Sequence, residues 1–132
     1  MKAYWLFILI LIISALCGCT KSESIMMPLD GSWVDISTSS DTIIFTQFGT
    51  DPAFELRRGP EERNGYLLPR YGAGIYCYKI TGDTIALEDL LSSAGGYINF
   101  YFKQNTDGSF VIGNFYDQAF SPNEKITFLR IK

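Results

Sequence analysis

The chain has 132 residues, with 11 Lys and Arg against 14 Asp and Glu, and a formal net charge of −3. This length fits one domain, and the acidic excess argues against nucleic acid as a partner, because phosphate binding needs a basic face. The apolar content of 47% overstates the core, because fifteen of the first 18 residues are apolar. The N-terminal segment is therefore far more apolar than the remainder of the chain.

The first 18 residues have the composition of a secretory signal peptide. A short positive start, Met1-Lys2, precedes an almost wholly apolar run from Ala3 to Leu16. Fourteen helical residues reach about 21 Å, short of the roughly 30 Å hydrocarbon core of a bilayer. The run therefore fits the apolar region of a signal peptide better than a spanning helix; the alternative is an uncleaved N-terminal anchor helix.

The next residues, Leu16-Cys17-Gly18-Cys19, resemble a bacterial lipobox, in which small residues precede the cysteine that is lipidated. The resemblance implies cleavage before Cys19, a diacylglyceryl thioether on its sulfur, and palmitate-type acylation of the new amino group. Two or three such chains suffice for stable membrane anchoring. Since Thr20 rather than Asp follows, the resemblance also implies an outer-membrane lipoprotein of the bacterial cell envelope.

These features divide the chain into three parts: a signal peptide over residues 1–18, a lipid-anchored tether over 19–28, and a folded domain over 29–132. Cleavage leaves Cys77 as the one free thiol, so no intramolecular disulfide can form. Cys77 lies among bulky apolar residues in Ile75-Tyr76-Cys77-Tyr78, which favours a small buried hydrophobe over a reactive thiol.

Short strands account for the rest of the chain. No window from Leu29 onward has a helical period over ten or more residues, whereas short apolar or alternating runs bounded by Gly, Asp and Pro recur. The expected strands cover residues 31–37, 41–48, 53–58, 74–80, 84–87, 96–104, 109–115 and 125–131. The connections are short except at 59–72, where Asn64-Gly65 is a hairpin signal.

Eight strands with short turns favour an all-β, eight-stranded antiparallel up-and-down barrel, with a two-sheet sandwich as the competitor. Alternation is clearest where Ile98, Phe100 and Phe102 share one face, so we expect these three side chains to line the interior. The strand around Tyr76 and Tyr78 is apolar on both faces, so either its outer face is covered or its aromatic residues form a recognition surface.

Gly31-Ser32-Trp33 at the start of the first strand looks like the Gly-x-Trp signature of lipocalins and the calycin superfamily. In those barrels a basic residue of the last strand packs across the tryptophan, and Arg130 stands at the matching place. The chain is similar to short lipocalin-like lipoproteins of Bacteroidetes-type bacteria. It departs from secreted lipocalins in being shorter, in having no disulfide pair and in lacking a long helix before the final strand.

Catalytic residue sets cannot be assembled from this composition. The chain has no histidine, which removes Ser-His-Asp and Cys-His catalysis and any imidazole metal site. Most carboxylates fall at expected turns, where Asp is favoured for backbone reasons. Arg57, Arg58, Arg63 and Arg70, with neighbouring glutamates, are expected on a solvated loop. The sequence therefore predicts no enzyme, no metal site and no cofactor.

Two functions stay open for the domain. The first is a non-catalytic lipoprotein that binds a small apolar or amphipathic ligand, with Tyr76, Tyr78, Ile98, Phe100 and Phe102 as the expected contacts. The alternative is a surface interaction or inhibitor module that uses an aromatic outer face and the long 59–72 loop. In either case we expect a monomer whose partners are the membrane, through its lipid, and for the first function a small hydrophobic ligand.

Overall fold

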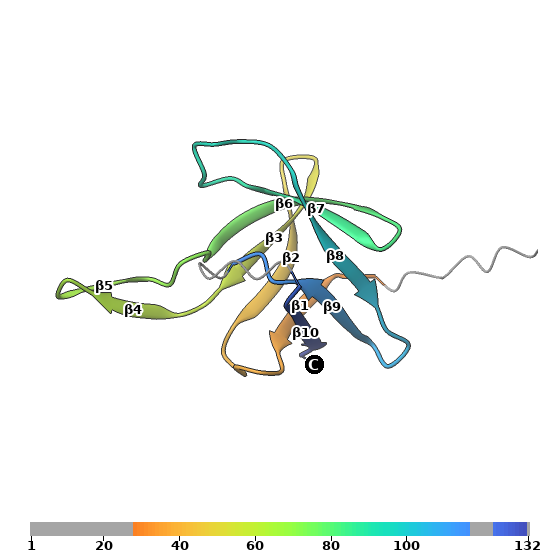
Figure 1. Ribbon diagram of the computed structural model, residues 1–132, viewed down its shortest axis with the longest axis horizontal. Coiled ribbons are helices and arrows are strands. Elements are labelled where there is room, and N and C mark those ends of the chain that lie inside the picture. The colour runs from red at the N-terminus through yellow and green to blue at the C-terminus, as the bar shows by residue number, and fades with distance from the viewer. Residues whose placement is uncertain (1–27, 117–122, 132) are drawn as a thin grey trace, which may run out of the picture.

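The computed structural model describes residues 28–116 and 123–131 (Figure 1). The described residues form strands and turns and contain no helix, so the predicted all-β class is confirmed. The strands are β1 (Gly31–Asp35), β2 (Thr42–Phe48), β3 (Asp51–Arg57), β4 (Pro60–Arg63), β5 (Tyr66–Pro69), β6 (Gly74–Thr81), β7 (Thr84–Asp89), β8 (Ile98–Gln104), β9 (Ser109–Gly113) and β10 (Lys125–Arg130).

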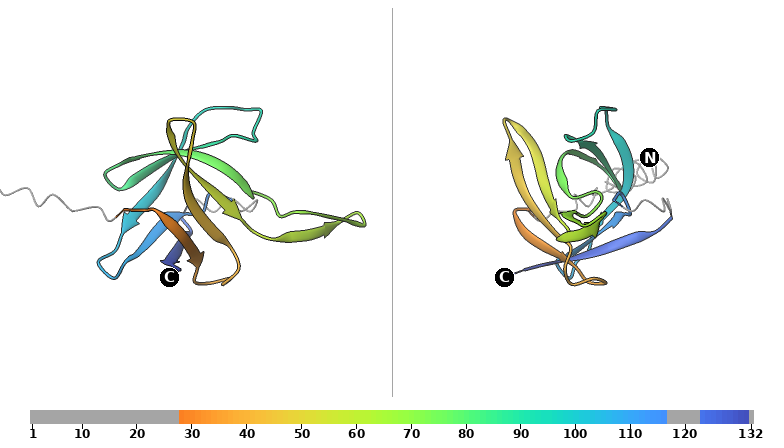
Figure 2. Two further views of the ribbon diagram at one scale, coloured as in Figure 1. Left: turned by 180° about the vertical axis from the view of Figure 1, so that it is seen from behind. Right: turned by 90° about the vertical axis from the view of Figure 1, so that its left-hand side faces the viewer.

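Eight of these strands close into an antiparallel barrel in the order β1-β10-β9-β8-β7-β6-β3-β2. Each strand pairs with its neighbour in the chain once the β4–β5 insertion is passed over, and β1 closes the ring against β10, with Trp33 opposite Arg130. In the right-hand view of Figure 2 the strands surround a common interior. The up-and-down barrel is therefore confirmed, the sandwich is wrong, and the architecture is compatible with a lipocalin-like fold.

Strands β4 and β5 form a separate two-stranded hairpin that projects from the barrel (Figures 1 and 2). Its turn is Asn64-Gly65, where both residues have positive φ angles of 54° and 79°, as a two-residue turn matched to strand twist requires. The base of the hairpin is closed by a hydrogen bond from Arg70 N to Gly59 O of 3.1 Å. Residues 60–69 are thus an appendage on a barrel that is complete without them.

Aromatic and branched side chains fill the middle of the barrel. Because strand side chains alternate, one residue in two points inward, and Phe54, Phe110 and Phe128 are fully buried. Phe110 stacks on Phe128 with ring centroids 5.2 Å apart, and Phe102 packs on Phe110 at 5.6 Å. Each such ring contributes roughly 1.5–3 kcal/mol by leaving water.

Trp33 closes one end of the barrel. Its side chain is 2% exposed, and its Nε1 donates to Leu29 O at 2.8 Å. The Arg130 guanidinium carbon lies 5.7 Å from the centre of the indole ring, within the roughly 6 Å reach of a cation–π contact. Gly31 has a φ of 102°, and a Cβ there would lie 3.5 Å from the Arg130 guanidinium. The positive φ therefore favours glycine at this position, because the distance to Arg130 would be an ordinary van der Waals contact.

The first strand is shorter than the expected 31–37, because the Asp35 side chain ends it. Ser37 N donates to Asp35 Oδ1 at 2.8 Å, and the Ser37 and Thr38 hydroxyls also donate to this carboxylate. Such side-chain to backbone bonds turn the chain out of the sheet.

Cys77, on the outer face of β6, is 4% exposed, and burial together with the nearby Asp51 and Glu88 raises the pKa of its thiol.

Candidate functional site

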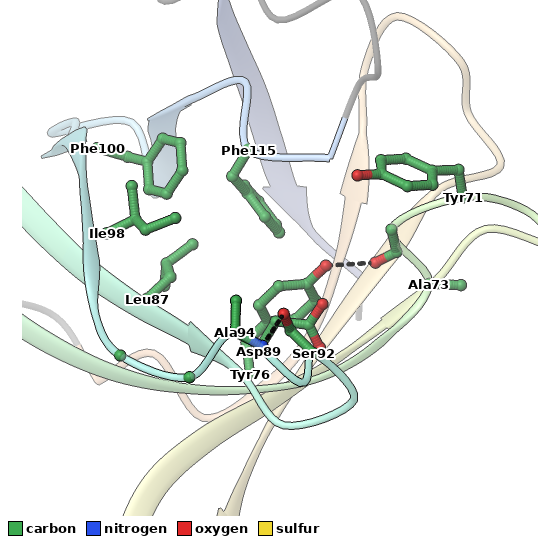
Figure 3. Close-up of a pocket in the computed structure, with 13 residues that line it drawn as sticks. Tyr71, Ala73, Tyr76, Leu87, Asp89, Ser92, Ala94, Ile98, Phe100 and Phe115 are labelled. Atoms are coloured by element: carbon green, nitrogen blue, oxygen red, sulfur yellow. Dashed lines mark hydrogen bonds between the residues drawn. The ribbon is translucent and has the colours of Figure 1, made fainter.

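A cavity of about 270 Å³, whose lining residues are drawn in Figure 3, opens at the barrel end opposite Trp33 and Arg130. Strand ends provide five of its lining side chains: Tyr76, Leu87, Asp89, Ile98 and Phe100. These residues lie where β6 and β8 begin and β7 ends, whereas Gly31 and Arg130 mark the other end of the antiparallel ring. We call this space the mouth cavity.

Small residues provide much of the remaining wall. The loop between β7 and β8 contributes Ser92, Ala94, Gly95 and Gly96, and the segment before β6 contributes Tyr71, Gly72 and Ala73. Figure 3 shows the apolar side chains of β7 and β8 on one side of the cavity, with Tyr71 and Ala73 on the other. Apart from Tyr71, the lining residues from these two segments are small.

Stacked aromatic rings hold the cavity wall in place. Tyr76 stacks on Phe54 with centroids 5.3 Å apart, and Phe115 meets the Tyr76 ring edge-on at 5.2 Å. Phe115 also contacts Phe100 at 6.0 Å. Contacts of this kind favour fixed ring orientations, so the apolar wall is formed before any ligand arrives.

The Tyr76 hydroxyl is committed to the fold. It donates to Gly72 O at 2.7 Å, which ties the segment before β6 to the cavity wall. Burial raises the pKa of Tyr76 well above its usual value, and the negative charge of Asp89 raises it further. The group is therefore a neutral donor at physiological pH.

Asp89 brings a carboxylate to this otherwise aromatic and small-residue lining. Its Oδ1 accepts a hydrogen bond from Leu91 N at 2.8 Å, and its backbone oxygen accepts one from Ser92 N at 3.2 Å. No lysine or arginine is among the residues that line the mouth cavity. None of the ion pairs formed within the described ranges involves Asp89.

Three of the five expected contact residues meet at the mouth cavity: Tyr76, Ile98 and Phe100. Ile98 is 61% exposed and stands at the rim. Tyr78 and Phe102 lie outside it, deeper along their strands: Tyr78 packs on Phe45 at 5.5 Å, and Phe102 is 1% exposed in the aromatic core. Strand alternation predicts that Tyr78 and Phe102 point to the interior, but it does not predict how far along the barrel they lie. That position decides whether a side chain joins the core or the cavity wall.

Sequence reasoning missed several cavity residues. Asp89, Tyr71 and Phe115 were not candidates, nor was the loop over residues 92–96. Two features of the sequence could have identified these residues. The small-residue run Ala94-Gly95-Gly96 lies between two strands. Counting along the hairpin from the β6–β7 turn places Asp89 opposite Tyr76.

A buried ion pair lies close to the mouth. Arg58 Nε lies 2.9 Å from Asp41 Oδ2, and the Asp41 side chain is fully buried. Arg58 also donates to Tyr71 O at 2.6 Å and to Tyr116 O at 3.2 Å, with its guanidinium carbon 4.4 Å above the Tyr116 ring. Placing Arg58 on a solvated loop was wrong, because its guanidinium links the residue before β2 to the cavity wall and to the segment after β9. Its neighbour Arg57 does face solvent.

A second, more open groove of about 480 Å³ runs between the hairpin and the barrel. Its apolar lining includes Leu67, Leu68, Pro69 and Leu91. Tyr66 and Leu67 on β5 are 71% and 72% exposed, so the hairpin presents apolar side chains to solvent. The groove thus extends the apolar surface around the mouth.

Comparison of the chain with protein-family models, with curated proteins and with solved structures found no match. Among residues 28–116 and 123–131, no group of three His, Cys, Asp or Glu side chains could hold a metal ion. In the part of the chain that the structure describes, no helix is long and apolar enough to cross a membrane. Cys19 lies outside the described residues.

Proposed function

We propose that this protein binds a small apolar or amphipathic ligand in the mouth cavity and catalyses no reaction on it. The observation that carries the proposal is an open cavity with an aromatic wall at one end of a barrel whose middle holds a cluster of buried apolar side chains. Ligand sites are typically concave and mostly apolar, with a few placed polar groups. The mouth cavity is concave, and its lining combines the apolar side chains of Phe100 and Phe115 with polar groups that include the Asp89 carboxylate and the Tyr71 hydroxyl.

The size of the cavity limits the ligand. A volume of about 270 Å³ corresponds to roughly nine waters at about 30 Å³ each, so a body of about ten non-hydrogen atoms fits. Deeper entry would have to displace Phe54, which is fully buried beneath Tyr76. The part of the ligand that enters the cavity is therefore smaller than a sterol or a fatty acid with a long chain.

Filling the cavity tests the proposal. Ala94 lines the cavity and Ser93, its neighbour in the same exposed loop, does not. We expect Ala94→Phe to reduce affinity at least tenfold for every ligand of the mouth cavity, with Ser93→Phe as the matched control that leaves affinity unchanged. The probes are 2-phenylethylamine, 2-phenylethanol and phenylacetate, measured by saturation-transfer NMR. Absence of binding by all three, or equal binding to both variants, would contradict the proposal.

The absence of catalysis is part of the proposal. The chain has no histidine, and Asp89 has no second carboxylate beside it in the cavity lining, whereas glycoside hydrolysis needs a pair. Recovery of each probe unchanged after incubation is the expected result. Turnover that is lost in Asp89→Asn would overturn this part.

We further propose that Cys19 is lipidated and anchors the protein in the outer membrane of a bacterial cell envelope. The support is the lipobox-like Leu16-Cys17-Gly18-Cys19 after a short apolar run. Leu29 lies at the Trp33 end of the barrel, so the described part of the chain begins opposite the mouth cavity. Cys19→Ser should move the protein out of the detergent phase and block globomycin-sensitive processing; a variant that still processes and partitions as before would contradict the anchor.

A second candidate function is an interaction module, favoured by the exposed Tyr66 and Leu67 on β5. Within the described residues β5 pairs only with β4, so its free edge suits an extended peptide added as a strand.

Because Arg70 N bonds to Gly59 O, residues 60–69 can be excised with little change to the barrel. Probe binding should survive this excision. Loss of probe binding despite an intact barrel would shift the ligand site to the hairpin.

A further inference from the structure

The mouth cavity contains a negative charge that an apolar ligand would not use. Asp89 is the one carboxylate among its lining residues, and no lysine or arginine lines it. Asp89 Oδ1 accepts a hydrogen bond from Leu91 N. Asp89 Oδ2 takes part in no hydrogen bond or ion pair within residues 28–116 and 123–131. A carboxylate that a ligand covers without a compensating partner loses its hydration at a large cost.

The aromatic rings around the cavity also favour a positively charged ligand. Tyr71, Tyr76, Phe100 and Phe115 line the cavity, and the face of an aromatic ring is the negative part of its quadrupole. Rings of this kind attract an ammonium group, more strongly when water is excluded. The Tyr76 hydroxyl proton is used by Gly72 O, so this residue offers no free donor to an anionic ligand.

We propose that the ligand is a small organic amine, with its ammonium group on Asp89 and a compact apolar body against Phe100 and Phe115. This inference rests on the proposed function and adds the chemical class of the ligand. An acid of the same size is repelled by Asp89, and a neutral alcohol leaves the charge without a partner. The cavity volume allows one ring or a short branched chain beside the ammonium group.

The test compares three molecules that share one apolar body: 2-phenylethylamine, 2-phenylethanol and phenylacetate. Titrations use the full chain in lipid nanodiscs, because detergent monomers are themselves amphipathic competitors. We expect the wild-type protein to bind the amine at least tenfold more tightly than the alcohol, and the alcohol more tightly than the acid. This comparison needs no variant and so does not depend on how a substitution folds.

Asp89→Asn then isolates the charge. Asparagine keeps the oxygen that accepts from Leu91 N, so the turn after β7 is preserved while the negative charge is removed. The matched control is Asp83→Asn, which makes the same change in the exposed β6–β7 turn at the other barrel end. We expect Asp89→Asn to weaken amine binding at least tenfold and to leave alcohol binding within threefold, with no effect of Asp83→Asn.

The outcomes separate this inference from the proposed function. If the alcohol or the acid binds as tightly as the amine, or if Asp89→Asn leaves amine affinity unchanged, the amine assignment is overturned and the cavity remains a ligand site. If none of the three binds to the wild-type protein, the proposed function fails and the assignment fails with it.

Discussion

Replacing Arg58 by methionine should destabilise the barrel by about 3 kcal/mol. The change keeps much of the apolar stem but leaves the Asp41 carboxylate, which is 0% exposed, without its partner at 2.9 Å. Breaking a buried pair from one side costs about 3–5 kcal/mol. The lower end applies because the Arg58 side chain is 15% exposed and Arg70 Nη1 remains 4.0 Å from Asp41. Typical domains have a total stability of about 5–15 kcal/mol, so the loss is large.

Urea unfolding of residues 20–132 measures this cost, because Trp33 is then the one tryptophan and its emission reports unfolding. Arg57→Met is the matched control: it breaks an exposed pair with Glu55, whose contribution should be at most about 1 kcal/mol. Asp41→Asn combined with Arg58→Met should cost less than the sum of the single changes. The reasoning is refuted if Arg58→Met costs no more than Arg57→Met.

Three further predictions concern the core and its buried groups. Trp33→Ala should cost about 3–5 kcal/mol in urea unfolding, followed by circular dichroism because this variant lacks the fluorescent reporter, and Arg130→Ala about 1–2 kcal/mol; no measurable cost of Arg130→Ala would contradict a stabilising contact with the ring. Burial raises the pKa of Tyr76 and Tyr116, so the unfolded chain loses these protons first as the pH rises. The free energy of unfolding should therefore fall above about pH 10, by up to about 1.4 kcal/mol per pH unit and tyrosine, when pH 9 and pH 11 are compared. A slope unchanged in the phenylalanine variants would contradict this origin. The Cys77 thiol in residues 20–132 should react with a disulfide reagent only on unfolding, since it is 4% exposed; rapid labelling of the folded protein would show that it is accessible.

The number of short strands and the turns between them predicted the barrel, and alternation predicted the inward face where it was clear. Phe102 and Phe128 both point into the core, as their strand parity requires. The depth of each residue could not be predicted in the same way, because it depends on how neighbouring strands are staggered. Phe102 pairs with Ile112 in the middle of the barrel, whereas Phe100, two residues earlier, lines the mouth cavity.

The polar partners near the mouth were harder to predict than the apolar core. Asp41 and Arg58 are polar residue types that are common in turns and loops, so neither predicts a buried position. They meet because the β2–β3 hairpin pairs Thr42 with Arg57, which places the next residues outward along the hairpin beside each other. The tight Gly49-Thr50 turn fixes that register, so counting from the turn is the signal that could have found the pair.

The most direct test of the account is a chemical-shift titration of methyl-labelled protein with 2-phenylethylamine. Ala73, Ala94 and Ile98 line the mouth cavity, while Ile43, fully buried in the core, lies outside it. The account predicts saturable shifts at the three cavity methyl groups, little change at Ile43, and loss of the shifts in Asp89→Asn. Shifts that cluster on Leu67 of the hairpin, or no saturable shift at any methyl group, would contradict it.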